Sequence, residues 1–109
     1  VYKRQNRFYL VDWKSNFLGD SLEAYNQKAL SEVMSRELYV LQYHLYTLAL
    51  DQHLRVRMPG YRYEENFGGV FYVFLRGVHP ETAPHFGVYR DIPSPDLITH
   101  LRKDLIEEN

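Results

Sequence analysis

The stretch Leu10-Val11-Asp12-Trp13-Lys14-Ser15-Asn16-Phe17 predicts a β-strand that ends in a carboxylate and an ammonium group. Successive side chains of a strand point to opposite faces, so Asp12 and Lys14 project from one side and Trp13 from the other. Charges at the end of an apolar strand cost free energy unless they pair or bind a metal ion. Two interpretations stay open at this point: an exposed ion pair of small energetic value, or a site for metal-dependent chemistry.

Composition limits the possibilities. The 109 residues are 45% hydrophobic and 16% aromatic, which predicts a single folded domain with a real core. Without cysteine there is neither a disulfide framework nor a thiolate zinc site. The net charge of −1 means that any DNA binding would use local basic clusters or other subunits. No apolar stretch approaches the ~18 residues needed to span a bilayer, so we expect no membrane segment.

The order of elements along the chain predicts an α/β domain. The expected elements are a strand over 7–15, two helices within 22–57 with a break near 35–36, a strand over 70–75, a short edge strand over 88–90 and a helix over 95–107. Asp20 and Glu23 have the spacing of a capping box and predict the start of the first helix. The apolar run over 70–75 is typical of a strand buried on both faces.

The second predicted helix carries an apolar stripe with a polar residue inside it. The stripe consists of Leu38, Leu41, Leu45, Leu48 and Ala49, and the last helix has a similar set in Leu97, Ile98, Leu101 and Leu105. Gln42 lies within the stripe, and Tyr46 follows one turn later. Gln42 and Tyr46 are either site residues or a buried amide with a packing tyrosine, and the residues alone favour the second interpretation.

Three segments together resemble a known family. They are Tyr9-Leu10-Val11-Asp12-Trp13-Lys14-Ser15-Asn16-Phe17-Leu18-Gly19, Tyr39-Val40-Leu41-Gln42-Tyr43-His44-Leu45-Tyr46-Thr47-Leu48-Ala49-Leu50 and Phe67-Gly68-Gly69-Val70-Phe71-Tyr72-Val73-Phe74-Leu75-Arg76-Gly77-Val78. In this order they resemble the C-terminal nuclease domain of the RecB family, the beta subunits of bacterial exodeoxyribonuclease V. The resemblance covers nearly the whole chain. It implies a restriction-endonuclease-like PD-(D/E)xK core, with a small mixed sheet flanked by helices.

The resemblance also implies roles for individual residues. Asp12 matches a metal-binding aspartate, and the main-chain carbonyl of Trp13 matches a second metal ligand. Lys14 matches the catalytic lysine, and Gln42 and Tyr46 match a Q-x-x-x-Y motif, which makes a functional role for them the favoured one. The implied reaction is Mg²⁺-dependent hydrolysis of DNA in double-strand-break repair and recombination. The implied setting is the bacterial cytoplasm, in a complex with RecC and RecD. The parent enzyme also uses ATP, in a helicase domain that is absent from residues 1–109.

One departure from the family pattern stands out. The family has a further aspartate on the strand before Asp12, whereas residues 1–11 contain no acidic side chain. We therefore expect residues 1–109 to be an N-terminally truncated, single partial domain that holds half a metal site and is inactive alone. A missing neighbouring strand would leave a hydrogen-bonding edge exposed beside residues 7–15, which predicts self-association.

Two other functions remain possible. Nuclease folds can persist as non-catalytic modules that bind DNA or dock subunits, although an intact Asp12 and Lys14 argue against such decay. A generic α/β interaction domain would explain the fold but not the three matched segments. An aspartate one or two residues upstream of Val1 would favour the enzyme over the module.

Overall fold

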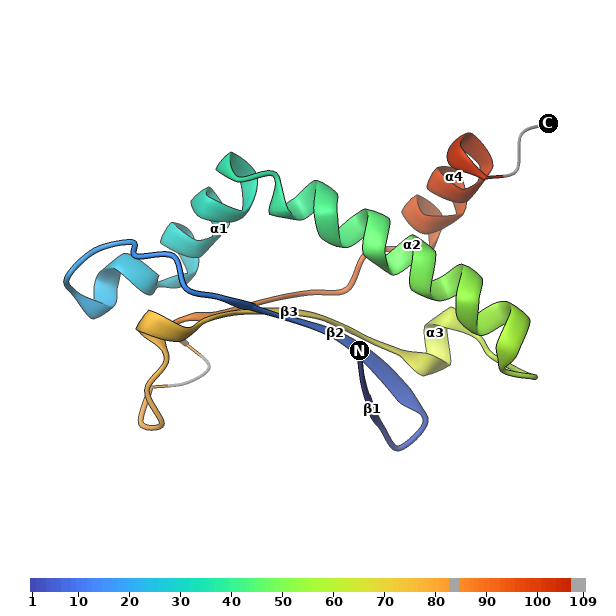
Figure 1. Ribbon diagram of the computed structural model, residues 1–109, viewed down its shortest axis with the longest axis horizontal. Helices are drawn as coiled ribbons and strands as arrows, with labels where there is room; N and C mark the ends of the chain where they lie inside the picture. The colour runs from blue at the N-terminus through green and yellow to red at the C-terminus, as the bar shows by residue number, and fades with distance from the viewer. Residues whose placement is uncertain (83–84, 107–109) are drawn as a thin grey trace.

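The computed structural model describes residues 1–82 and 85–106, and its centre is a four-stranded mixed sheet (Figure 1). The strands are β1 (Tyr2–Arg4), β2 (Arg7–Lys14), β3 (Phe67–Phe74) and β4 (Val88–Asp91), in the spatial order β1-β2-β3-β4. The central pair, β2 and β3, is parallel, and both outer pairs are antiparallel. The expected α/β class with a small mixed sheet is thus confirmed.

The helices lie mainly on one side of this sheet. They are α1 (Gln27–Arg36), α2 (Tyr39–Arg57), α3 (Tyr63–Asn66) and α4 (Pro95–Leu105), with short 3₁₀ turns η1 (Leu22–Tyr25) and η2 (Leu75–Gly77). Figure 1 shows α1, α2 and α4 above the same face of the sheet, with none of them on the other side. The predicted break between two helices is confirmed, two residues later than expected, at Leu38, whose φ is 60°.

The hydrophobic core lies between this face and the helices. Val70, Tyr72 and Phe74 of β3 are at most 1% exposed and pack with Leu30 and Met34 of α1. The intervening residues of β3, Phe71 and Val73, are only partly buried. The expectation that this strand is buried on both faces therefore holds for one face only.

The N-terminal hairpin was not expected from the sequence. Gln5 and Asn6 have positive φ angles of 52° and 68°, which is the geometry of a tight hairpin turn. β1 consequently pairs with Arg7–Tyr9 of β2. The exposed edge predicted along residues 7–15 is therefore covered at its start, and the described β1 ladder does not reach Leu10–Lys14. Self-association through that edge stays a prediction.

The predicted capping box is wrong. Helix α1 begins only at Gln27, and its cap is Asn26, whose side-chain oxygen accepts a hydrogen bond of 2.8 Å from the Ala29 amide. Asp20 lies before the 3₁₀ turn η1, which has no side-chain cap. Glu23 lies within this turn, so the acidic pair does not start helix α1.

The apolar stripe predicted for α2 is also mostly wrong. Leu38, Leu41 and Leu45 are 65%, 55% and 40% exposed, and of the predicted set only Leu48 is buried. The buried face instead consists of Tyr43, Thr47, Leu48, Asp51 and Leu54. The physical reason is that the buried polar groups are satisfied: the Tyr43 hydroxyl donates to the Asp91 carboxylate of β4, and the Thr47 hydroxyl donates to the Tyr43 carbonyl.

The last helix departs from its predicted face in a similar way. Ile98 is buried and Leu101 is partly buried, as expected, whereas Leu97 and Leu105 are 42% and 57% exposed. The helix itself is confirmed, with Ser94 as its cap. Among the described residues, no helix is both long and apolar enough to cross a membrane.

A buried ion pair joins α2 to α4. Asp51 is 1% exposed and forms an ion pair with Arg102, which is 5% exposed. Arg55 contributes a second cation, with its Nε 3.2 Å from the Asp51 carboxylate. The Nε of Arg102 also donates to the Gln52 side chain over 2.7 Å. Removal of Asp51 would therefore leave Arg102 buried without a counter-charge, whereas removal of Arg102 would still leave Arg55 beside Asp51.

Replacement of Asp51 by alanine should lower the free energy of unfolding by about 3–5 kcal/mol, because Arg102 would remain buried without its partner. The measurement is urea unfolding followed by circular dichroism. Arg36→Ala is the control, since its pair with Glu37 is exposed and should change stability by less than ~1 kcal/mol. Equal losses in the two variants would show that the buried pair is not a determinant of stability.

Candidate functional site

The acid–lysine pair lies where β2 ends, on the face that the helices cover. Asp12 and Lys14 project from the same side, and the Lys14 Nζ lies 3.4 Å from the Asp12 Oδ1. Their side chains are 31% and 18% exposed, respectively. The pair is therefore semi-buried, so it is neither a surface ion pair nor sealed from a substrate.

Two tyrosine rings surround the lysine. The Lys14 Nζ lies 4.3 Å from the ring centroid of Tyr39, at the start of α2, and 5.5 Å from that of Tyr72. Both distances are within the range of a cation–π interaction, which stabilises an ammonium group as its hydration is lost. Tyr72 pairs with Asp12 in the β2–β3 ladder, so it lies beside the acid as well as the lysine.

Gln42 is connected to this pair through Tyr72. The Tyr72 hydroxyl donates a hydrogen bond of 2.5 Å to the Gln42 Oε1. Burial raises the pKa of Tyr72, and the negative charge of Asp12 raises it further. Tyr72 therefore stays protonated and remains a donor to Gln42, whose amide nitrogen is left to bind another group.

Tyr46 and Trp13 are placed differently from the other predicted site residues. Tyr46 is 50% exposed, one turn after Gln42. Its phenol lies close enough to Tyr72 to contribute to that residue's raised pKa. The Trp13 side chain points to the opposite face and is 63% exposed. The role predicted for Trp13, that of a metal ligand, belongs to its main-chain carbonyl and stays a prediction.

The sequence did not reveal Tyr39, Tyr72 or Asn16 as part of this cluster. Asn16 lies just after β2, and its amide is 3.3 Å from the Tyr39 hydroxyl, to which it donates. A usable signal did exist for Tyr72, because it is a polar-tipped residue within the apolar run 70–75. Tyr39 gave no such signal, since its position depends on how α2 lies over the sheet.

The donor set tests whether these residues could hold Mg²⁺. Hard divalent cations take oxygen ligands and usually require one or two carboxylates. Asp12 supplies one carboxylate, and in residues 1–82 and 85–106 no group of three or more histidine, cysteine, aspartate or glutamate side chains is placed to bind a metal ion. The residues present therefore do not make a complete magnesium site by themselves.

The geometry defines a class of protein: a small α/β domain with an acid–lysine pair at a strand end, backed by tyrosines and a glutamine. No family model matches the chain. It is 50% identical over 101 residues to the RecBCD enzyme subunit RecB of Haemophilus influenzae, which covers 93% of this chain. It is 49% identical over 98 residues to RecB of Escherichia coli and 38% identical over 106 residues to RecB of Mycobacterium tuberculosis.

The chain belongs to the RecB family. It spans only 8% of the length of the Haemophilus and Escherichia relatives. The resemblance of the three sequence segments to the RecB family is thereby confirmed. The assignment of this chain to a nuclease domain stays a prediction.

Raised tyrosine pKa values predict a loss of stability at alkaline pH. Burial raises the pKa of Tyr61 to about 12 and moves those of Tyr43, Tyr63 and Tyr72 further upward from 10.0. The unfolded chain releases these protons near pH 10, whereas the folded chain retains them. This part of the stability is therefore fully present below about pH 10 and declines as the pH rises above it.

Urea unfolding at about pH 9 and about pH 11 measures this decline. Tyr72→Phe should show a smaller loss between the two pH values, because it removes one of the retained protons. Tyr2→Phe is the matched control, since its ring is 55% exposed. An identical decline in both variants would contradict the assignment.

Proposed function

We propose that this chain carries part of the active site of a metal-dependent deoxyribonuclease with a restriction-endonuclease-like core. The observation that carries the proposal is the semi-buried Asp12–Lys14 pair at the end of β2, in a chain that belongs to the RecB family. Acid-x-lysine on a strand is the core of the PD-(D/E)xK motif. In the proposed reaction, water attacks a DNA phosphorus atom and the phosphodiester bond to the leaving oxygen breaks.

Each residue has a role that follows from its position. Asp12 is one metal ligand, and the Trp13 carbonyl is proposed as another. Lys14 orients the attacking water and stabilises the negative charge that develops on the phosphate, since it lies 3.4 Å from Asp12. Gln42 is held by Tyr72 and, with Tyr46, faces the scissile phosphate or the adjacent DNA backbone.

The hairpin register indicates where a second carboxylate would come from. Tyr2 pairs with Tyr9 and Lys3 with Phe8, so each step backward along β1 corresponds to one step forward along β2. Continued upstream in a longer polypeptide, this register places the second residue before Val1 opposite Asp12. Directly opposed residues share a face, with Cα atoms about 4.5–5.5 Å apart. An aspartate at that position would complete the carboxylate pair that Mg²⁺ requires.

The wider setting follows from the family. The Haemophilus and Escherichia relatives are named as subunits of a RecBCD enzyme. For a polypeptide containing this chain we propose RecC and RecD as partners, DNA as substrate, and repair and recombination of DNA in the bacterial cytoplasm as the process. ATP would serve a helicase domain outside the matched segment.

The alternative is a non-catalytic module for DNA binding or subunit docking. Among residues 1–82 and 85–106, Asp12 is the carboxylate at the site and no larger metal-binding group is present, which favours the module for these residues alone. The residue opposite Asp12 discriminates between the two functions, because a module has no need for an acid there.

A chain extended upstream of Val1, with aspartate as the second residue before Val1, tests the proposal. This protein should bind Mn²⁺ in calorimetry and degrade linear DNA, because the two opposed carboxylates complete the site. Asparagine at the same position should abolish both properties. Lys14→Gln should retain metal binding but lose activity by roughly 100-fold or more, since it removes only charge stabilisation and water positioning.

The control for this experiment is Arg57→Ala, an exposed change at the far end of α2. It should leave both metal binding and DNA degradation unchanged. DNA degradation that survives Asp12→Asn and Lys14→Gln equally would contradict the proposed site. So would Mn²⁺ binding that is as tight in the 109-residue chain as in the extended one.

A further inference from the structure

The ion pair with Asp12 does not by itself fix the Lys14 side chain. A lysine is a flexible four-carbon stem that ends in a compact charge, so it adopts many rotamers unless its surroundings restrict it. Asp12 gives the ammonium group one contact, with 3.4 Å between the Lys14 Nζ and the Asp12 Oδ1. Both residues stand on β2, which fixes where the stem begins but not where it ends. Further restraint on the ammonium group comes from residues that face it on other elements.

Two tyrosine rings provide this restraint. The ring centroids of Tyr39 and Tyr72, which together form the ring pair, are 5.5 Å apart, and the ring planes are tilted by 32°. The Lys14 Nζ lies 4.3 Å from the Tyr39 centroid and 5.5 Å from the Tyr72 centroid. The ammonium group thus packs against both rings. Tyr39 is the nearer of the two and therefore contributes the stronger attraction.

The ring pair is itself fixed at both ends. Tyr72 is 1% exposed, and its hydroxyl donates to the Gln42 Oε1 over 2.5 Å. The Asn16 Nδ2 donates to the Tyr39 hydroxyl oxygen over 3.3 Å. Asn16 follows Lys14 by two residues, so this hydrogen bond ties the start of α2 to the end of the strand that carries the lysine. The position of the Tyr39 ring over the lysine therefore does not depend on helix packing alone.

An aromatic ring restrains an ammonium group without neutralising its charge. A second carboxylate at the place of Tyr39 would neutralise Lys14 and occupy more of its three N–H donors. The face of a ring attracts the cation through its quadrupole instead. The lysine therefore keeps both charge and N–H donors for a phosphate oxygen or a water molecule.

We propose that Tyr39 is a positioning residue for Lys14: its ring, supported by Tyr72 and tied to the strand end by Asn16, holds the ammonium group where it meets the scissile phosphate. This inference rests on the nuclease function proposed above and deepens it. Tyr39 acts through the lysine rather than on the DNA. The competing role for Tyr39 is packing alone, since its side chain also lies against the hydrophobic core.

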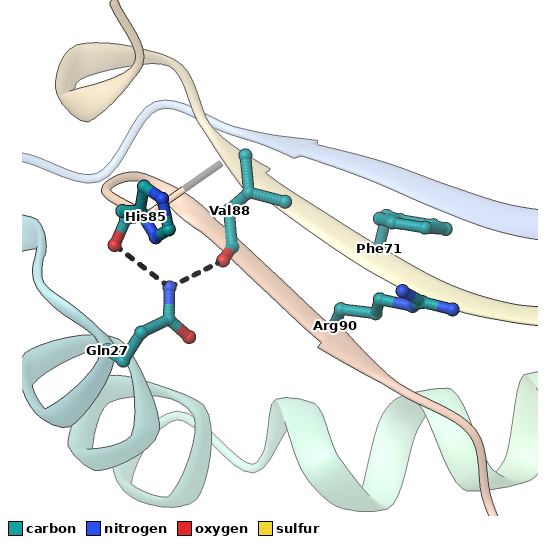
Figure 2. Close-up of a pocket in the computed structure, with 5 residues that line it drawn as sticks. All are labelled: Gln27, Phe71, His85, Val88 and Arg90. Atoms are coloured by element: carbon teal, nitrogen blue, oxygen red, sulfur yellow. Dashed lines mark hydrogen bonds between the residues drawn. The ribbon is translucent and has the colours of Figure 1, made fainter. Parts of the chain in front are cut away.

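The ring pair restrains the lysine from one face of the sheet. Tyr72 and Phe71 are neighbours on β3, so their side chains point to opposite faces. Figure 2 shows the hollow of about 290 Å³ on the Phe71 side, where the Gln27 amide donates to the carbonyls of His85 and Val88 over 3.1 and 2.9 Å. Because the ring pair lies on the opposite face, this hollow takes no part in holding the lysine.

Proton NMR of the lysine side chains tests the contact without any chemistry. A proton above an aromatic ring resonates upfield, so the ε-methylene signal of Lys14 should lie upfield of those of the exposed Lys28 and Lys103. Lys14→Gln identifies the signal by removing it. Tyr39→Leu should move the signal toward the two reference lysines, whereas Tyr39→Phe, which keeps the ring, should not. An unchanged signal in Tyr39→Leu would overturn the proposal.

A double-mutant cycle tests the role of Tyr39 in the reaction. In a hybrid RecBCD enzyme, this chain replaces the matched segment of Haemophilus RecB, and the single-turnover rate of DNA cleavage is measured. Tyr39→Leu should lower the rate at saturating DNA by about 10-fold, because a displaced lysine loses the productive geometry. The DNA concentration for the half-maximal rate should stay unchanged, and Tyr39→Phe should keep the rate within about 2-fold. In the Lys14→Gln background, Tyr39→Leu should cause no further loss.

The outcomes separate this inference from the function on which it rests. Cleavage that is unchanged by Lys14→Gln would show that the proposed nuclease site is wrong, and the role of Tyr39 would be wrong with it. If Lys14→Gln lowers the rate and the loss in Tyr39→Leu multiplies with it in full, the nuclease site stands and the positioning role is overturned. An increase in the half-maximal DNA concentration alone would overturn the positioning role in the same way.

Two further variants complete the experiment. Tyr2→Leu makes the same substitution at a ring that is 55% exposed, and it should change neither the Lys14 signal nor the cleavage rate. Asn16→Ala keeps both rings and removes the tie between them and the strand end, so it applies even if Tyr39→Leu does not fold. It should lower the cleavage rate and move the Lys14 signal in the direction expected for Tyr39→Leu. No effect of Asn16→Ala on either measurement would contradict the proposal.

Discussion

The parallel pairing of β2 with β3 is the constraint on which the rest of the structure depends. Parallel neighbours cannot be joined by a tight turn, so the chain needs a long crossover. Residues 15–66 form it, and they include α1, α2 and α3. The crossover places α2 over one face of the sheet, and the pairing itself places Tyr72 beside Asp12. Lys14 and Gln42 are thus linked through Tyr72, because one strand pair fixes both the register and the side on which the helices lie.

Sequence patterns predicted the features that depend only on the alternation of side chains along a strand. The shared side of Asp12 and Lys14 follows from a two-residue period alone, and the structure confirms it. The buried face of α2 could not be predicted in this way, because hydrophobicity favours leucines over tyrosines and acids. Tyr43 and Asp51 are buried nevertheless, since Tyr43 donates a hydrogen bond to Asp91 and Asp51 forms an ion pair with Arg102. Those partners come from elements 40 or more residues away, which no local window contains.

The residues around the Asp12–Lys14 pair were harder to predict than the pair itself. The resemblance predicts that Gln42 belongs to the site of Asp12 and Lys14, and the hydroxyl that binds Gln42 comes from Tyr72 of β3. The Tyr39 ring beneath Lys14 depends on the left-handed residue Leu38, which turns the chain from α1 into α2. Leucine rarely adopts this conformation, so neither its propensity nor its position signals the turn.

The two faces of β2 have different chemistry, and the same alternation separates them. Asp12 and Lys14 lie toward the helices, and Trp13, between them, lies on the opposite face of the sheet. The acid–lysine geometry is set by the backbone of a strand end, and this strand pairs with β3 as far as Lys14. The β1 ladder stops at Tyr9, so between Leu10 and Lys14 the described strand that pairs with β2 is β3, and the other contacts of this segment come from side chains on its two faces.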